Sequence, residues 1–404
     1  MRILFILDSV ENPTSANVLL GHRLAAALAG CGHQVRLLEL WDGARRPAVP
    51  EGLKAEYLAF PDERMMNAAL ENGARQGSAL PLRLLRLMAH PTAVAAAFRQ
   101  LILHRPHRVM RTIRELEKLD AAEPQDVVCA VCAPYRSAFA LEQARITGRR
   151  VLWQLDPYAS NRDYRAPGGY PRELALLDRM DASFVTRQAR KDYEPGAPLA
   201  AASAKIHLLD FPALVPPAEA VTDRSGSRRC VFCGSLYPGL REPGFALELF
   251  SALGAQSGWT LVMAGGGWKP FAAQAERAEQ AMGGHLQIPG PVPLADARAL
   301  LAGADVLLNL GNAVENQLPS KLFEYFAAGK PVLHLAMIEN DPALPYLARY
   351  PLSLVLHRGQ PDAADRLAQW LDRVAGKRLS FAEVEALFPE LRPDAVARQF
   401  LNAL

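Results

Sequence analysis

The stretch from residue 305 to residue 335, DVLLNLGNAVENQLPSKLFEYFAAGKPVLHL, decides the fold of its half of the chain. It begins as a buried strand and passes through a polar loop. Pro319 and Ser320 then open a helix, in the manner of a first helical residue and a cap, and Gly329 ends it. Pro331 begins another strand. A strand, a loop and a helix in this order predict an anion site, because backbone N–H groups and the helix dipole meet where the helix starts.

Three side chains at the start of this helix fit such a site. Ser320 lies at the cap, and Lys321 adds a positive charge beside the expected phosphates. Glu324 follows one helical turn later, where its carboxylate would accept hydrogen bonds from both hydroxyl groups of a ribose. The pattern therefore predicts that this helix binds a nucleoside diphosphate.

Short apolar runs alternate with helical patterns along the whole chain, which predicts an α/β fold with parallel sheets. The predicted strands are residues 2–8, 34–40, 126–133, 150–156 and 182–186 in the first half, and residues 230–236, 260–267, 286–290, 305–311 and 331–336 in the second half.

A segment between the two series of strands divides the chain. Residues 212–229, PALVPPAEAVTDRSGSRR, are rich in proline, serine and charge, which is typical of a linker. We expect a first domain at residues 1–211, a second at 230–385, and a C-terminal helix at 386–404 that packs back on the first domain. Two Rossmann-like domains would then face each other across a cleft, beside the strand ends where doubly wound sheets bind ligands.

Composition narrows the class of partner. The 404 residues carry a formal net charge of +3, which is too small to favour nucleic acid as the main ligand. The N-terminal apolar run ends at Asp8, so it is far shorter than a membrane span and lacks a signal-peptide cleavage site. We expect a cytoplasmic protein that binds no nucleic acid.

Four of the five cysteines form two Cys-x-x-Cys pairs, Cys129 with Cys132 and Cys230 with Cys233. This spacing also occurs in zinc ribbons. Both pairs fall in strand-like runs, where residues three apart point to opposite faces of a sheet. We therefore expect buried strand cysteines rather than a zinc site.

The segment PSKLFEYFAAGKPVL, residues 319–333, resembles the donor-site segment of the large retaining glycosyltransferase family with the twin-Rossmann, or GT-B, fold. The likeness is greatest to bacterial capsular and surface-polysaccharide members. It implies that Glu324 holds the donor ribose. The family usually has a second glutamate eight residues earlier, where this chain has Asn316 beside Glu315, so the resemblance makes these two residues catalytic candidates.

A second element of the resemblance is CGSLYPGLREP, residues 233–243. The family has a glycine-rich turn here, with one or two cations directed at the diphosphate. In this chain Gly234 lies in the turn, Ser235 stands where an arginine is common, and Arg241 stands near the usual lysine. Because a guanidinium fork binds phosphate in a bidentate way, Arg241 is the best candidate phosphate ligand. The alternative is a solvated surface arginine.

Two further loops belong to the predicted donor site. AGGGWKP, residues 264–270, has neither the spacing of a dinucleotide fingerprint nor that of a P-loop. We expect its Gly265 to bring a backbone turn close to the nucleotide. The resemblance places Pro291, within residues 289–293, against the base.

In the first half of the chain, Asp156 ends the predicted strand of residues 150–156. Family members have a histidine or an aspartate at this place, so the resemblance makes Asp156 a catalytic candidate. A carboxylate there would orient the acceptor hydroxyl or stabilise an oxocarbenium-like transition state. The alternative is a turn cap, since Asp-Pro pairs favour turns.

Residues 80–114 contain seven arginines, three histidines and no acidic residue. Arginines between apolar residues favour a basic amphipathic surface that attracts anionic lipids. We expect Arg83, Arg86, Arg105 and Arg108 to bind such lipids, and the alternative is an ordinary pair of helices. Peripheral binding at the inner face of the cytoplasmic membrane would suit an acceptor carried on a lipid.

The resemblance implies a glycosyltransferase that moves a sugar, with retention, from a nucleoside diphosphate sugar to a hydroxyl of a glycan or lipid-linked acceptor in surface polysaccharide or glycolipid assembly. No Asp-x-Asp pair occurs in the sequence, so we expect neither a metal ion nor another cofactor, with Arg241, Lys321 and the helix dipole in their place. Two alternatives remain: a nucleotide-sugar 2-epimerase, and a non-catalytic nucleotide-sugar-binding subunit.

Overall fold

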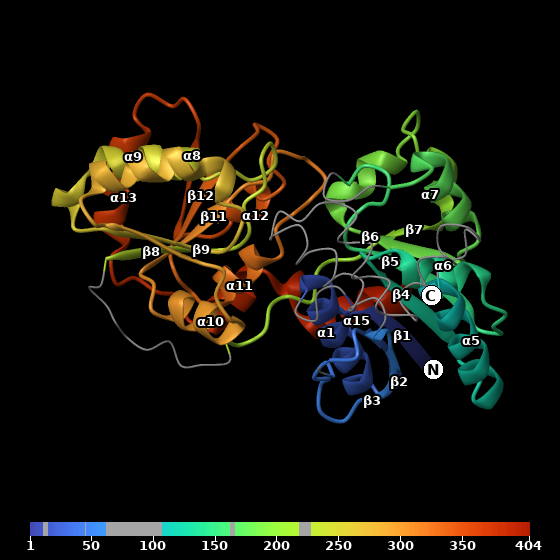
Figure 1. Cartoon of the computed structure of the whole chain (residues 1–404). Coiled ribbons are helices and arrows are strands. Elements are labelled where there is room, and N and C mark those ends of the chain that lie inside the picture. Colours follow the sequence, from blue (N-terminus) through green and yellow to red (C-terminus); the bar gives the residue numbers. More distant parts are fainter. Residues whose placement is uncertain (11–14, 45, 62–106, 162–165, 218–227) are drawn as a thin grey trace. The chain divides into compact units, whose positions relative to one another are not determined.

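The computed structural model describes residues 1–10, 15–44, 46–61, 107–161, 166–217 and 228–404. The chain forms two compact units (Figure 1). Unit 1 consists of Met1–Pro212 and Pro393–Leu404, and unit 2 is Ala213–Arg392. Each unit is built on a parallel sheet between helices, which confirms the predicted α/β class with two Rossmann-like domains.

Unit 1 contains a seven-stranded parallel sheet in the order β3-β2-β1-β4-β5-β6-β7. The chain leaves β1 in one direction across the sheet and returns to place β4 on its other side. The order therefore reverses between β1 and β4, and loops that follow these strands lie where doubly wound sheets bind ligands. The strands are β1 (Arg2–Asp8), β2 (Gln34–Trp41), β3 (Lys54–Ala59), β4 (Val127–Cys132), β5 (Arg149–Gln154), β6 (Ala182–Val185) and β7 (Ile206–Leu208).

Helices cover both faces of this sheet, because successive strand residues point to opposite faces. In β1, Leu4 and Ile6 belong to a core cluster shared with α5, α6 and α7, whereas Phe5 packs against Phe400 of α15. Among the described residues, the helices of unit 1 are α1 (Ala16–Gly30), α5 (His107–Ala122), α6 (Arg136–Gln143), α7 (Gly169–Asp178) and α15 (Pro393–Asn402), with short 3-10 turns at Arg187–Tyr193 and Ala200–Lys205.

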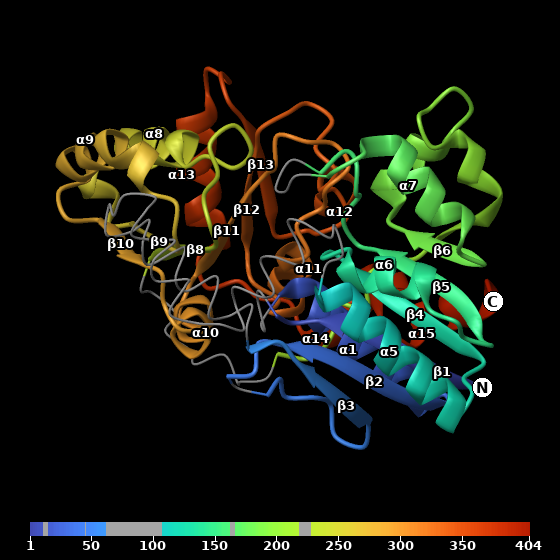
Figure 2. The ribbon, with the colours of Figure 1, turned by 45° about the vertical axis from the view of Figure 1, so that its right-hand side comes forward.

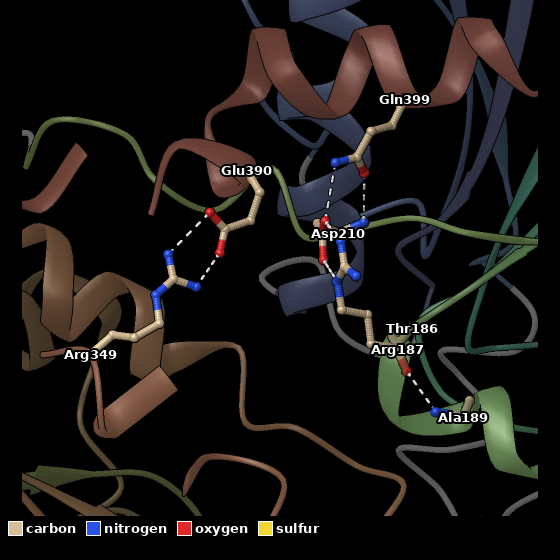
Figure 3. A network of polar contacts seen from close by, with 7 residues as sticks. All are labelled: Thr186, Arg187, Ala189, Asp210, Arg349, Glu390 and Gln399. Carbon is tan, nitrogen blue, oxygen red and sulfur yellow. Dashed lines mark hydrogen bonds and ion pairs between the residues drawn. The ribbon is translucent and has the colours of Figure 1, made fainter. Parts of the chain in front are cut away.

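The C-terminal helix α15 is part of unit 1, although the whole of unit 2 precedes it in the chain. It lies against α1 (Figures 1 and 2), and its Phe400 stacks on Phe184 of β6 with ring centroids 4.7 Å apart. Gln399 and Asp210 share two hydrogen bonds, one in each direction (Figure 3). The Asp210 carboxylate also accepts hydrogen bonds from Nε and Nη2 of Arg187. These contacts fix α15 beside the point where the chain first leaves unit 1.

Unit 2 contains a six-stranded parallel sheet in the order β10-β9-β8-β11-β12-β13. This is the Rossmann order 3-2-1-4-5-6, and its reversal lies between β8 and β11. The strands are β8 (Arg229–Cys233), β9 (Thr260–Ala264), β10 (Leu286–Gly290), β11 (Val306–Leu310), β12 (Val332–Ala336) and β13 (Ser353–His357).

On one face of this sheet, α8 and α13 pack together over apolar residues of β8, β9 and β11, and α9 packs beside α8. Near the end of the unit, α11 is anchored by Phe326, which stacks on Phe388 just after α14. Arg349 and Glu390 form an ion pair close to where the chain leaves unit 2 (Figure 3). The helices are α8 (Gly244–Leu253), α9 (Ala272–Met282), α10 (Leu294–Ala302), α11 (Lys321–Ala327), α12 (Leu344–Leu347), α13 (Ala363–Val374) and α14 (Phe381–Leu387).

The boundaries of the units lie at residues 212/213 and 392/393. The predicted linker contributes residues 213–217 to unit 2, where Leu214 is buried and its N–H donates to the carbonyl of Leu391. Residues 218–227 of that segment lie outside the described residues. The region 386–404 does not form one helix, because α14 ends at Leu387 and α15 begins at Pro393.

Candidate functional site

The loops that follow β8 and β11 meet at the reversal point of the unit 2 sheet. Arg241, in the loop after β8, donates from Nε and Nη2 to Oδ1 of Asn312, in the loop after β11, at 3.0 and 2.8 Å. The N–H of Ala313 donates to the carbonyl of Leu240 at 2.8 Å. One guanidinium is thus held across the reversal point, and its third nitrogen, Nη1, lies 3.4 Å from the carbonyl of Ser235.

Lys321 adds a second positive charge at the same place. Lys321 as a whole is exposed to solvent. The ammonium at the end of its side chain nevertheless points inward and donates to the carbonyl of Cys233, the last residue of β8, at 2.9 Å. Desolvation of this end lowers the pKa of Lys321, and the nearby Arg241 lowers it further. Two cations therefore converge on the carboxyl end of β8.

The short helix α11 begins at Lys321, directly after Ser320. Ser320 occupies the N-cap and makes no side-chain cap hydrogen bond, and Pro319 precedes the cap. The prediction that Pro319 takes the first helical position is therefore wrong. Glu324 lies in the first turn and is exposed, whereas its neighbours Phe323 and Tyr325 are buried. The carboxylate of Glu324 is consequently presented to solvent one turn from Ser320.

Glycines allow the neighbouring loops to approach each other. Gly265 has a φ of +139°, and a Cβ built on it would lie 1.8 Å from the carbonyl oxygen of Gly234. Only glycine fits such a contact without movement of the backbone. The N–H of Gly234 donates to Ala264 and that of Gly265 to Gly290, which ties together the loops after β8, β9 and β10.

Pro291 follows this last hydrogen-bonded glycine. Its ring lies near Gly266, where an added Cβ would be 3.8 Å from Pro291 Cγ. The predicted donor-site residues Gly234, Ser235 and Gly265 therefore share one edge of the unit 2 sheet with Pro291 and with the two cations.

Glu315 and Asn316 follow β11 in the loop that leads to α11, and they differ in environment. Asn316 is 8% exposed, whereas Glu315 is exposed and accepts a long hydrogen bond of 3.4 Å from Asn340. Both residues make further interactions. The carboxylate of this pair is thus accessible to solvent, while the amide is turned inward.

A buried polar network lies beneath this loop, and the sequence did not suggest it. His334 in β12 receives a hydrogen bond of 2.7 Å from the Asn309 amide at Nδ1, and its Nε2 lies 3.1 Å from Asp341. Because an amide nitrogen only donates, His334 carries its proton on Nε2 and donates it to Asp341. The Asp341 carboxylate lies so close to Gly311 that a Cβ there would be 2.3 Å from it.

Besides this network, Asn312 is a functional residue that the sequence analysis did not identify. It is 5% exposed and holds Arg241 by two hydrogen bonds. It lies two residues after the end of β11, and this position is the one signal that could have drawn attention to it, because polar residues at the carboxyl ends of parallel strands commonly serve ligand sites.

In unit 1, Asp156 follows the carboxyl end of β5. Its Oδ2 accepts a hydrogen bond of 3.0 Å from the Asn17 amide, which also donates to the carbonyl of Ala133 after β4. The hydroxyl of Tyr135 donates to the Asp156 carbonyl at 2.7 Å. Asn17, in the first turn of α1, therefore orients the Asp156 carboxylate, while Tyr135 fixes its backbone.

A buried carboxylate supports the same loop from below. Glu173 of α7 accepts hydrogen bonds from the N–H groups of Tyr158 and Ala159 and from the amide of Gln154. Burial raises the pKa of Glu173, and the three hydrogen bonds oppose this rise. Gln154 in turn binds the hydroxyls of Tyr135 and Tyr193. The loop that carries Asp156 thus rests on a fully connected polar network.

Only the end of the predicted basic surface can be described. Residues 80–106, with Arg83, Arg86 and Arg105, lie outside the described residues. Arg108 of α5 is 1% exposed and donates two hydrogen bonds of 2.9 Å to the Asp8 carboxylate. The prediction that Arg108 faces a lipid surface is therefore wrong, because its charge is compensated inside unit 1.

The four Cys-x-x-Cys cysteines lie in strands, as expected. Cys132 and Cys230 belong to the two core clusters, while Cys129 and Cys233 point away from them. Burial raises the pKa of all four thiols. Among the described residues, no group of three or more His, Cys, Asp and Glu side chains is arranged to hold a metal ion. In the same part of the chain, no helix has the length and apolar character of a membrane span.

Comparisons with known proteins bear on the fold and on part of unit 2. Residues 227–341 match the family model of Glycosyl transferases group 1. No curated protein sequence matches the chain. Among solved structures, the Anabaena protein Alr3699/HepE in complex with UDP-glucose is similar over 100% of both chains, with 13% identity and a TM-score of 0.60.

Two further solved structures cover almost the entire chain. WaaG, a glycosyltransferase involved in lipopolysaccharide biosynthesis, covers 99% of this chain and 98% of its own, with 15% identity and a TM-score of 0.56. The lipopolysaccharide outer core galactosyltransferase WaaB covers 100% and 99%, with 13% identity and a TM-score of 0.55. The chain therefore has the GT-B fold, and the part of unit 2 that holds Arg241, Lys321 and Glu324 matches the Glycosyl transferases group 1.

Proposed function

We propose that the chain is a glycosyltransferase that moves a sugar from a nucleoside diphosphate sugar to an acceptor hydroxyl. The observation that carries this proposal is Arg241, which Asn312 holds across the reversal point of the unit 2 sheet. Similar proteins of known structure support the choice of donor, since Alr3699/HepE was solved with UDP and with UDP-glucose.

In this proposal the donor diphosphate binds to unit 2. Arg241 and Lys321 would neutralise the charge that develops on the leaving diphosphate, so that no metal ion is needed. Glu324, exposed one turn into the site, would accept the ribose hydroxyls. Gly234, Ser235 and Gly265 would let backbone approach the phosphates, and Pro291 would contact the base.

The acceptor would bind to unit 1, with Asp156 as the carboxylate that orients its hydroxyl. Glu315 is the second catalytic candidate, since its carboxylate is exposed, and Asn316 would act through its amide. We further propose retention at the anomeric carbon and a role in surface polysaccharide or glycolipid assembly. Two of the similar proteins support this class of acceptor: WaaG is involved in lipopolysaccharide biosynthesis, and WaaB is a lipopolysaccharide outer core galactosyltransferase.

We propose that the enzyme works in the cytoplasm and binds the inner face of the membrane through residues 80–107 and Arg114, without Arg108. Arg114 is exposed on α5. Co-sedimentation with anionic vesicles at low salt tests this part alone, and a chain that ignores such vesicles would remove it without affecting the donor site.

Binding of nucleoside diphosphates tests the donor site. A thermal-shift series with UDP, GDP and ADP should identify one ligand that raises the unfolding temperature, since a ligand at 100 times its Kd stabilises by about 2.7 kcal/mol. The Arg241→Gln variant should lose this shift, while Arg277→Gln, an exposed arginine on α9, should keep it. Equal shifts in both variants would contradict the proposed site.

Product analysis tests the reaction itself. Incubation with donor and a glycan acceptor should give a glycosylated product, and the reaction should survive EDTA. Free epimerised sugar from donor alone would indicate the 2-epimerase instead. Nucleotide binding with no turnover by the purified chain would indicate a non-catalytic subunit.

A further inference from the structure

A second cationic site lies in unit 1, away from the candidate residues. A cavity of about 740 Å³ opens between the end of α6, the start of β5 and α7. Arg150 lines it near the amino end of β5, whereas Asp156 follows the carboxyl end of the same strand. The cavity and the proposed acceptor carboxylate are therefore at opposite edges of one sheet.

Four of the residues that line this cavity are arginines, and one is acidic. The acid, Glu142, forms a two-pronged ion pair with Arg172, whose guanidinium also lies over the ring of Phe139. Glu142 compensates the charge of Arg172, and the other three arginines have no acidic residue in the lining to pair with. Arginine outnumbers acid in the lining, so the cavity is positively charged.

The remaining arginines have few partners. Arg150 donates from Nη2 to the carbonyl of Ala144 at 2.9 Å, and its Nε is buried without a hydrogen-bond acceptor in the structure. Arg145 and Arg179 are exposed at the cavity, and the described residues offer their guanidinium groups no hydrogen bond or ion pair. The carboxylate of Asp181 is engaged by the backbone N–H of Arg150 at 2.7 Å.

A purely structural explanation accounts for part of this arrangement. Arg145 lies just beyond α6 and Arg179 caps α7, where a cation interacts favourably with the negative end of the helix dipole, by about 0.3–1 kcal/mol. The dipole explains one cation at each helix end. It does not explain why Arg150, from a strand, joins them with a buried nitrogen that no acceptor satisfies, since buried polar groups are normally paired.

We propose that this cavity binds a phosphate-bearing ligand at a site separate from the proposed donor site in unit 2. Guanidinium forks pair with phosphate oxygens in a bidentate way, and a phosphate oxygen would supply the acceptor that Arg150 Nε lacks. The volume lies within the usual range of small-molecule sites, about 300–1,000 Å³. The phosphate belongs either to a soluble compound or to a phospholipid head group, and the two sources are separable by experiment.

Inorganic pyrophosphate is a suitable soluble probe, with the donor site disabled by Arg241→Gln. In that background, calorimetry should detect pyrophosphate binding that weakens at least tenfold when Arg145→Gln and Arg179→Gln are added. The matched control adds Arg190→Gln and Arg277→Gln, which remove the same charge from exposed arginines outside the cavity. The control should bind like the background protein.

The second arm uses vesicles of phosphatidylcholine with phosphatidic acid. Loss of co-sedimentation in the cavity variant, but not in the control, would assign the phosphate to a lipid head group. Loss of pyrophosphate binding alone would assign it to a soluble compound. If the cavity variant and the control behave alike with both probes while their thermal unfolding stays like that of the background, the proposal is refuted. Failure of Arg241 as a donor ligand would leave this comparison intact, because both proteins carry the same Arg241→Gln change.

Discussion

Removal of the Asn312 amide should weaken nucleotide binding without removing any charge from the donor site. Asn312 Oδ1 accepts from Arg241 at 3.0 and 2.8 Å and is itself buried. Hydrogen bonds to charged groups contribute about 1.5–3 kcal/mol, but Arg241 is half-buried, so water replaces part of what is lost. We therefore expect Asn312→Ala to cost about 1–2 kcal/mol of UDP binding, which is roughly a 5- to 30-fold rise in Kd.

A double-mutant cycle shows whether Asn312 acts through Arg241. Calorimetric titrations with UDP would compare the wild type, Asn312→Ala, Arg241→Gln and the double variant. If the amide serves only to aim the guanidinium, its removal should change nothing once Arg241 is replaced. Asn402→Ala, an exposed residue of α15, is the matched control and should bind UDP like the wild type.

Two results would refute this reasoning. One is an Asn312→Ala variant that binds UDP as tightly as the wild type while it remains folded, which would mean that Arg241 needs no support or makes no contact. The other is an equal loss in both backgrounds, which would make Asn312 an independent ligand.

Three further predictions concern stability. Gly265→Ala should lower the free energy of unfolding in urea by about 1–3 kcal/mol or more, because the added Cβ meets the Gly234 carbonyl at a positive φ. Gly284→Ala, at φ +88° with open space around it, should lower it less, and equal losses would mean that the contact is irrelevant. Glu173→Gln should lower the free energy of unfolding by about 1–3 kcal/mol, because the new amide NH2 would face a group that donates to the present carboxylate. Glu194→Gln, at an exposed position, should leave stability unchanged, and an equally stable Glu173→Gln variant would show that the network is dispensable. Burial lowers the pKa of Lys330 to about 7 in the folded protein. Between pH 7 and the pKa of the unfolded lysine, the unfolded state binds more protons, so the free energy of unfolding should rise with pH. Lys330→Met should flatten this rise in pH-dependent urea unfolding, and an unchanged slope would exclude Lys330 as its source.

Ten strands could be predicted from the sequence because each is a short apolar run bounded by turn residues. The strands that were missed have weaker signals. β3 reads KAEYLA, in which only Leu58 is buried, and β7 is three residues long at an edge of its sheet. β13, an edge strand, reads SLVLH and begins two residues after Pro351. Edge strands bury less surface, so their apolar pattern is less complete.

Ser320, Lys321 and Glu324 could be placed on one loop-helix segment because glycine, proline and lysine mark that segment locally. Their mutual arrangement could not be predicted. Arg241 and Asn312 are 71 residues apart, and their hydrogen bond depends on the strand order that brings β8 beside β11. The burial of Arg108 was hidden for the same reason. Its partner Asp8 is 100 residues away, and a run of arginines looks identical whether its members face solvent or a carboxylate.

The return of α15 to unit 1 has a consequence for synthesis on the ribosome. Residues 393–404 are translated after the whole of unit 2, and they supply the Phe400 ring that packs against Phe5 and Phe184. A nascent chain that has completed β1 to β7 therefore still exposes an apolar strip on that sheet while the whole of unit 2 is being made. We expect this strip to be a binding site for chaperones during translation, and a stop codon before Pro393 would leave it uncovered permanently. A helix made after unit 2 thus completes a sheet made before it.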